Sequence, residues 1–217
     1  QAIFSKYKNK YCGTLGDIGC LSFHETKNIT SCEGGAIILN KKSFDRKASI
    51  ICNKGTDREY FNKSLKKYYS WSGLGSSYIP SEITCSILYS QLLNYKKIMK
   101  EREKIWKNYS LFFKRIKTQL VETRETFSKK IKINHHMFFL ICKNFNVREK
   151  ILSKLRKENI LSTFHYIPLH KSIMGSKYYR GKLSVTESLS KKIIRLPFWI
   201  GMDQKIVFKK LKKILNV

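Results

Sequence analysis

The chain has 217 residues, and its 44 lysine and arginine side chains outnumber 15 aspartate and glutamate side chains, which gives a formal net charge of +29 at pH 7. Hydrophobic residues at 42% and aromatic residues at 13% supply a packed core, so an intrinsically disordered chain is excluded despite the charge. A chain of this length forms one large domain or two small ones. No apolar run approaches the roughly 20 residues that span a bilayer.

The N-terminus and the cysteines bear on location. Residues 1–13 (QAIFSKYKNKYCG) lack the apolar stretch of a signal peptide. The six cysteines are scattered without a CxxC pair, and a chain of this size needs no disulfide staples. We therefore expect a reducing, cytoplasmic location without a membrane. The histidines and cysteines show no metal-ligand spacing, so no metal site is expected either.

The positive charge first suggests a nucleic-acid partner, because clustered basic side chains neutralise phosphates and release counterions. The distribution of the charge favours another interpretation. Only nine of the basic residues are arginines, and the lysines are spread over nearly every segment. No zinc-finger, RRM or KH signature is present. We interpret most lysines as solvated surface positions and expect no nucleic-acid partner, with a basic nucleic-acid-binding module as the alternative.

The first 80 residues predict strands followed by a helix and a loop. Residues 18–23 and 35–39 are short apolar runs of the strand type, separated by a polar loop that is expected at a sheet edge. Residues 42–53 predict a helix. Residues 54–80 predict an irregular stretch, because they are rich in glycine, serine and aromatic residues.

A long amphipathic helix is predicted from Ser81 to about Lys117, because apolar residues recur there every three to four positions. Ser81 is expected to cap its N-terminus, with Pro80 just before it. A helix of this length often connects two domains, and we place the domain boundary inside it, near residue 100.

The last third of the chain alternates between strand and helix patterns with short connections, which predicts an α/β layer. The predicted elements are a strand at 131–142, a helix at 147–158, a strand at 160–166, a helix at 185–194 and a closing helix at about 203–215.

Lys27 is the first candidate for chemistry. It lies in a loop beside a strand end, close to serine, histidine and threonine residues, which is a suitable setting for an amine that attacks a carbonyl group. The chain has 35 lysines, however, and a surface role is the simpler interpretation for any one of them.

The order of residues around Lys27 favours the first interpretation. The segment SFHETKN at 22–28, followed by EGG at 33–35, resembles the cofactor-lysine segment of the sugar-nucleotide aminotransferases of the DegT/StrS type, which are fold type I enzymes of pyridoxal 5′-phosphate. The resemblance covers essentially the whole chain. Its other segments are Gln1-Ala2 with Tyr7-Lys8, Gly13-Thr14 with Gly16 and Gly19, KGT at 54–56, GSSY at 75–78, HHMF at 135–138, FHYIPLH at 164–170 and RLPF at 195–198.

The resemblance implies the C-terminal part of an α/β aminotransferase of fold type I. Residues 1–100 would be a remnant of the large cofactor-binding domain with the start of the connecting helix, and residues 101–217 the small C-terminal α/β domain. The forms HETKN, GSSY and FHYIPLH together most resemble the dTDP-4-amino-4,6-dideoxygalactose transaminases. These enzymes move an amino group from L-glutamate to a dTDP-4-keto-6-deoxy sugar, for a surface glycan of the enterobacterial common antigen type. A non-catalytic or degenerate fragment is the alternative.

The resemblance also implies roles for individual residues. Lys27 would hold the cofactor covalently and then move a proton between the substrate and the cofactor. Ser22 would bind the cofactor phosphate, and Gln1 the phenolic oxygen of its ring. Ser76 and Ser77 would reach the phosphate in the neighbouring subunit, which implies a homodimer with shared active sites. The candidates for binding the nucleotide sugar are, in order, His170, His165 and His24.

Simpler roles stay open for several of these residues. Ser22 and Thr26 can bond local backbone, as loop hydroxyls often do. Ser76 and Ser77 can be turn residues, and His135 and His136 can be packing residues of a strand. Cys32 stands where the family usually has glycine before EGG, so the loop shape is in doubt if that position needs a positive φ.

Family members begin well before residue 1 of this chain. The preceding part carries an aspartate that pairs with the pyridine nitrogen of the cofactor, which keeps the ring electron-withdrawing. We therefore expect the 217 residues alone to bind the cofactor weakly and to transaminate negligibly, whereas the complete polypeptide would be active.

Overall fold

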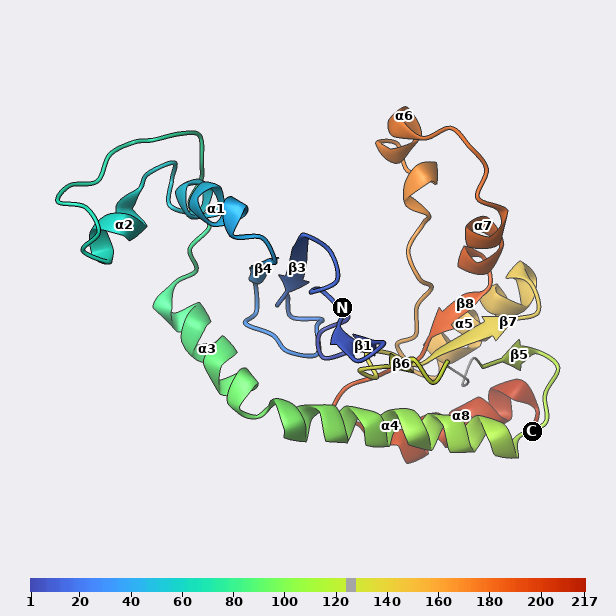
Figure 1. The fold of residues 1–217 in the computed structure, drawn as a ribbon. Coiled ribbons are helices and arrows are strands. Elements are labelled where there is room, and N and C mark those ends of the chain that lie inside the picture. The colour runs from blue at the N-terminus through green and yellow to red at the C-terminus, as the bar shows by residue number, and fades with distance from the viewer. Residues whose placement is uncertain (124–127) are drawn as a thin grey trace. The chain divides into compact units, whose positions relative to one another are not determined.

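The computed structural model describes residues 1–123 and 128–217. Contacts divide the chain into two compact units: a first unit of residues 1–97 with 128–136, and a second unit of residues 98–127 with 137–217. Both units contain helices and strands (Figure 1), which confirms the expected α/β class. None of the helices in the described ranges combines the length and the apolar content that a membrane span needs.

The first unit begins with a small antiparallel sheet in the strand order β2-β1-β6. Lys8 and Asn9 join β1 and β2, with φ of 46° and 64°. Two positive φ values are typical of the two-residue hairpin turn that matches the twist of the strands. The strands are β1 at Lys6–Tyr7, β2 at Lys10–Tyr11 and β6 at Ile131–Lys132.

A second antiparallel hairpin carries the segment with Lys27. β3 (Ile18–Ser22) pairs with β4 (Gly35–Leu39), and Ser22 stands opposite Gly35 at the end nearest the connecting loop. Both predicted strands are thus present. The helices of this unit follow: the 3-10 helix η1 at Lys42–Phe44, α1 at Asp45–Cys52, α2 at Arg58–Asn62 and α3 at Glu82–Leu93.

The predicted long helix is wrong in one respect, because it is two helices. α3 ends at Leu93, and α4 runs over Tyr95–Arg115. Between them Asn94 has φ −98° and ψ 9°, and its side-chain nitrogen donates a hydrogen bond to the carbonyl oxygen of Ser90 at 2.9 Å. Asparagine side chains compete in this way with the helical hydrogen bonds. The start was predicted correctly, since the Ser81 hydroxyl accepts a hydrogen bond from the backbone nitrogen of Thr84.

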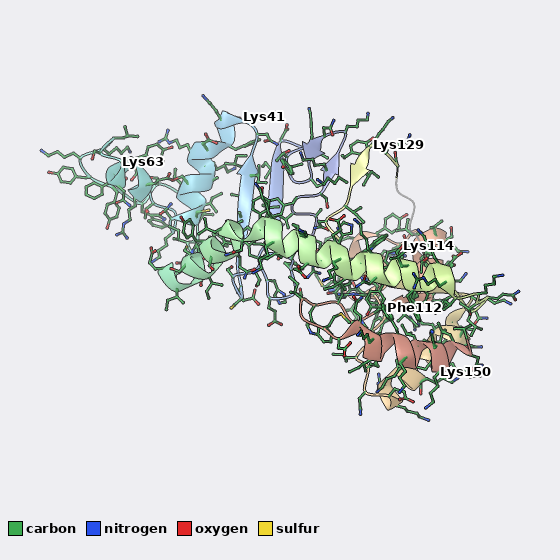
Figure 2. The ribbon with its side chains drawn as sticks, turned by 90° about the horizontal axis from the view of Figure 1, so that it is seen from below. Lys41, Lys63, Phe112, Lys114, Lys129 and Lys150 are labelled. Atoms are coloured by element: carbon green, nitrogen blue, oxygen red, sulfur yellow. The ribbon has the colours of Figure 1, made fainter. Side chains whose placement is uncertain are left out.

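The second unit packs helices against an antiparallel sheet in the order β5-β7-β8. α4 and α8 lie side by side (Figure 1), and Phe112 projects between them (Figure 2), where its ring stacks on Phe208 at 4.5 Å. The strands are β5 at Val121–Glu122, β7 at Phe139–Cys142 and β8 at Ile193–Arg195. The helices are α5 at Phe145–Lys157, η2 at Leu169–Lys171, α6 at Gly175–Tyr178, α7 at Ser184–Ser190 and α8 at Gln204–Leu215.

Tyr109 of α4 lies at the centre of this core and is fully buried. Its ring stacks on Phe138 at 5.0 Å and meets Phe208 edge-on at 5.4 Å. Its hydroxyl donates a 2.8 Å hydrogen bond to the carbonyl oxygen of Pro197, which satisfies the one polar atom of the side chain. The core therefore joins both long helices to the sheet.

Three predicted elements in the last third were wrong. The strand at 131–142 is split into β6 and β7, which belong to different sheets, because His135 adopts a positive φ of 50° between them. Residues 160–166 form no strand; only Thr163 makes an isolated bridge, to Arg195. The helix at 185–194 ends at Ser190, and β8 begins three residues later. No sequence pattern indicated that residues 128–136 return to the first unit.

Candidate active site

The loop that joins β3 to β4, residues 23–34, carries Lys27 and is called the lysine loop below. Its ends are closed by a hydrogen bond from the backbone nitrogen of Phe23 to the carbonyl oxygen of Gly34 at 2.8 Å. Within it the carbonyl oxygen of Phe23 accepts from the backbone nitrogen of Ser31 at 2.8 Å and from the Thr30 hydroxyl at 3.1 Å. The loop is therefore built by its own hydrogen bonds.

Buried side chains also hold the lysine loop in place. Phe23 and Ile29 are buried apolar anchors, and Asn28 and Ser31 are buried polar residues. Lys27 is partly buried between them, and its backbone nitrogen donates to the carbonyl oxygen of His24. Within residues 1–123 and 128–217, no carboxylate lies within ion-pairing distance of the Lys27 amine. The amine is thus held by a packed loop and is not neutralised by an acid of this region.

A network of amide side chains ties this loop to residue 1. Asn28 Nδ2 donates to the carbonyl oxygen of Asn134 at 2.8 Å, and Asn134 Nδ2 donates to the carbonyl oxygen of Gln1 at 2.6 Å. These two bonds join the lysine loop to the backbone of residue 1. The sequence indicates Asn28 only as part of a motif and does not indicate Asn134, because contacts over such sequence distances leave no periodic signal.

His24 and Thr26 form a local cluster with Glu33. The Thr26 backbone nitrogen donates to His24 Nδ1 at 3.2 Å, and the Thr26 hydroxyl lies 3.0 Å from the same atom. Since Nδ1 accepts, Nε2 of His24 carries the hydrogen, and it faces the Glu33 carboxylate at 3.4 Å. Thr26 therefore has the local role left open for it. Ser22, by contrast, ends β3 with an exposed side chain.

Cys32 adopts the backbone conformation that the family's glycine would favour. Its φ is 71°, and its backbone nitrogen donates to the Thr30 hydroxyl at 3.0 Å. Gly34, with φ 152°, passes so close to Ser31 that a Cβ there would lie 2.6 Å from the hydroxyl oxygen. The loop keeps its shape with a cysteine, at the expense of local strain.

Ser76 and Ser77 lie in an extended segment that pairs with the end of α1. The Ser76 backbone nitrogen donates to the carbonyl oxygen of Ile51 at 2.9 Å, and Ser77 forms a bridge with Asn53. The segment fits closely because a Cβ on Gly75 would lie 2.3 Å from the backbone nitrogen of Gly55. The backbones of both serines are hydrogen-bonded to or paired with the region at the end of α1, and both residues are exposed.

His170 and His165 belong to the second unit. The His170 side chain is only 6% exposed, and its Nε2 lies 3.1 Å from Glu187 Oε1. His165 is partly buried, and its Nδ1 has no hydrogen-bond partner among the described residues. Burial, and next the charge of Arg195, lower the pKa of His165. His170 is thus paired with Glu187, whereas His165 keeps one buried ring nitrogen without a partner in the described part of the chain.

The segment that contains His165 also lines an open cavity of about 550 Å³. Phe164 and Tyr166 contribute aromatic rings, and Arg148, Lys171 and Lys191 contribute positive charge. Aromatic and cationic side chains together suit a ligand with a ring and a phosphate group.

The sequence profile of the DegT/DnrJ/EryC1/StrS aminotransferase family matches residues 1–213. The chain belongs to this family. The uncharacterized protein MJ1066 of Methanocaldococcus jannaschii is 30% identical over 100% of this chain and 58% of its own length. The UDP-4-amino-4,6-dideoxy-N-acetyl-beta-L-altrosamine transaminase of Helicobacter pylori is 28% identical over 79% of this chain and 44% of its own length. The chain thus spans about half the length of the curated relatives that it matches.

Solved structures agree in fold. The aminotransferase TlmJ of Streptoalloteichus hindustanus superimposes with a TM-score of 0.85 at 19% identity, over 98% of this chain and 56% of its own. This match confirms the expected aminotransferase fold of type I. The chain covers little more than half of the matched structure. Members of the family use pyridoxal 5′-phosphate, and a sugar aminotransferase of Streptococcus pneumoniae has been solved in its PLP form.

Lys27 and the predicted residues outside the lysine loop, Ser22 and Gln1, fit this cofactor. Lys27 offers a partly buried amine without an acid partner in the described part of the chain, which suits covalent attachment to an aldehyde. Ser22 is an exposed hydroxyl residue at a strand end, and the backbone of Gln1 is joined to the lysine loop through Asn134 and Asn28.

Proposed function

We propose that the protein to which this chain belongs is a nucleotide-sugar aminotransferase with Lys27 as its catalytic residue. The observation that carries the proposal is the setting of Lys27: a partly buried amine on a packed loop, with no carboxylate partner in residues 1–123 and 128–217, tied to residue 1. A lysine with only a surface role does not need this support. Family membership gives the chemistry that such an amine serves.

Pyridoxal 5′-phosphate, when bound, supplies an electron sink for the reaction. Lys27 would hold it through its Nζ and, once released, would carry one proton from the cofactor to the reacting carbon of the sugar. Ser22 would donate a hydrogen bond to the phosphate, and Gln1 one to the phenolic oxygen. His24, oriented by Thr26 and Glu33, is one candidate for binding the substrate, and His165 and His170 are the others.

The substrate that we propose is a dTDP-4-keto-6-deoxy sugar, with L-glutamate as the amino donor. The product would be dTDP-4-amino-4,6-dideoxygalactose, for a surface glycan of the enterobacterial common antigen type. The motif forms HETKN, GSSY and FHYIPLH support this choice. The name of the Helicobacter pylori relative also describes a 4-amino-4,6-dideoxy sugar, although linked to UDP. The cavity beside His165, with its rings and cations, would suit the nucleotide diphosphate.

A cytoplasmic homodimer with shared active sites is part of the proposal. The exposed hydroxyls of Ser76 and Ser77 would reach the phosphate of the neighbouring subunit. Large apolar side chains stand exposed near these serines, including Trp71 at 78%, Leu74 at 88% and Ile83 at 76%. Exposed apolar surface of this kind is covered by further protein, either a second copy or the rest of the polypeptide.

Turnover tests the proposal. The complete polypeptide should convert the dTDP-linked 4-keto-6-deoxy sugar to its amine with L-glutamate, as measured by mass spectrometry and by NMR of the sugar. UDP- and GDP-linked 4-keto sugars are the comparison substrates, and Lys27→Ala is the matched control. Loss of at least about 10³-fold in rate is expected for Lys27→Ala, since the lysine is both the point of attachment and the proton carrier. Failure of every keto sugar to react, or an unchanged rate in Lys27→Ala, would favour the alternative of a non-catalytic protein.

A further inference from the structure

Asn28, the residue after Lys27, has a buried amide side chain whose donor and acceptor atoms must be hydrogen-bonded. Asn28 is 5% exposed, and a carboxamide buried without partners would destabilise the loop. Its Nδ2 donates to the carbonyl oxygen of Asn134 at 2.8 Å, and its Oδ1 lies 2.8 Å from His136 Nδ1. The bond to a carbonyl fixes which atom of the amide is nitrogen, so Oδ1 is the acceptor and His136 Nδ1 carries the hydrogen.

The partners of Asn28 belong to a segment that returns to the first unit from far along the chain. Asn134 is 9% exposed. Its own Nδ2 donates to the carbonyl oxygens of Gln1 at 2.6 Å and Ile3 at 2.9 Å, so it links the segment to residues 1–3. Three segments are thus joined through two asparagine side chains: residues 1–3, the lysine loop and residues 134–136. No strand pairing crosses from the lysine loop to either of the other two segments among the described residues.

Lys27 and Asn28 are neighbours in the chain, so the position of the Asn28 side chain fixes the backbone from which Lys27 projects. A lysine side chain has four rotatable bonds, and its amine is placed precisely only if its backbone is. Aspartate has the shape of asparagine but cannot donate to the Asn134 carbonyl oxygen, and alanine can neither donate nor accept.

From this geometry we infer that Asn28 is a positioning residue for Lys27, and that Asn134 extends its action to residue 1. The inference rests on the proposed function of Lys27. Asn28 does not touch the reacting atoms; it holds the lysine loop against residues 134–136 so that the Lys27 amine and Gln1 face the same site.

Two readouts on the complete polypeptide test the inference. Hydrogen exchange reports the opening of residues 24–31, and treatment with pyridoxal 5′-phosphate followed by borohydride and peptide mapping reports the attachment at Lys27. The variants are Asn28→Ala, Asn28→Asp and Asn134→Ala. Asn40→Ala is the matched control, because Asn40 Nδ2 also donates to loop carbonyl oxygens, those of Thr14 and Gly16, at the opposite end of the β3–β4 hairpin.

In the three test variants we expect exchange in residues 24–31 to become roughly tenfold faster or more, as local opening requires less free energy. The label on Lys27 should fall severalfold relative to that on the other lysines. Asn40→Ala should change neither. If Asn28→Ala loses the native circular dichroism, Asn28→Asp and Asn134→Ala carry the test.

The outcomes separate the two proposals. If the native sequence labels Lys27 selectively and the Asn28 variants label it equally well, with unchanged exchange, the positioning role is wrong and the proposed function stands. If the native sequence shows no preference for Lys27 but the Asn28 variants loosen the lysine loop, the proposed function is wrong and the structural action of Asn28 is supported. If Asn40→Ala loosens the lysine loop as much as Asn28→Ala does, the inference is also wrong.

Discussion

Cys32 has a positive φ, a backbone conformation that favours glycine over a residue with a side chain. A φ of 71° costs a non-glycine residue about 1–2 kcal/mol. Glycine would remove that strain but would regain about 0.4–1 kcal/mol of freedom in the unfolded chain. We therefore expect Cys32→Gly to raise the free energy of unfolding by about 0.5–1 kcal/mol, the difference between these two values. Urea denaturation measures it, and Cys32→Ala, which keeps the strain, should show no gain. Equal midpoints for the two variants would mean that the strain is absent.

The residues of the candidate site differ in how far the sequence could indicate them. Lys27 stood out because its neighbours in the chain form a motif. The local contacts of Thr26 were open to prediction because they span two residues. The contact of Asn28 with Asn134 spans 106 residues and has no periodicity, so only the folded chain reveals it.

At the scale of helices and strands, the local sequence predicted where an element begins better than where it ends. Ser81 begins α3 as expected, because capping depends on three neighbouring residues. The end at Asn94 was missed, since apolar spacing continues across it and only the asparagine side chain interrupts the backbone bonds. Part of β8 was predicted as the end of a helix, because a strand of three residues is too short to show an alternation of apolar and polar residues.

Asp57 precedes the short helix α2, and its carboxylate is hydrogen-bonded by the chain that follows this helix. The pH dependence of stability tests the role of this carboxylate. It is 2% exposed; Lys66 hydrogen-bonds one carboxylate oxygen, and the Ser70 backbone nitrogen donates to the other at 2.7 Å. The bond from Lys66, and next that from Ser70, lower the pKa of Asp57. A lowered pKa in the folded state contributes stability above the unfolded value of about 3.9, and this contribution is lost as pH falls through the folded pKa.

We therefore expect Asp57→Asn to make stability less dependent on pH below about pH 4. Some dependence should remain, because hydrogen bonds from basic partners also lower the pKa of Glu59, Glu158 and Glu187. Urea midpoints at a series of pH values measure the slope. Asp17→Asn, at an exposed ion pair with Lys41, is the control of equal charge. A slope as steep in Asp57→Asn as in the native sequence would contradict the role of Asp57.

At the scale of the whole molecule, the net charge of +29 has a plain structural interpretation. Lysine side chains project from loops and helices throughout each unit, as Lys41, Lys63 and Lys129 do in the first and Lys114 and Lys150 in the second (Figure 2). They are not gathered on one element. The α/β class and the family followed from motifs along the whole chain, whereas the return of residues 128–136 to the first unit depends on tertiary pairing with β1.

The central claim is that one lysine among 35 is built to hold the cofactor. Its most direct measurement is the position of the pyridoxyl group after the purified complete polypeptide is treated with pyridoxal 5′-phosphate and borohydride. We predict that the group lies on Lys27 in large excess over every other lysine, and that Lys27→Ala removes this signal without moving it elsewhere. A label spread evenly over the exposed lysines, and unchanged in Lys27→Ala, would contradict the claim.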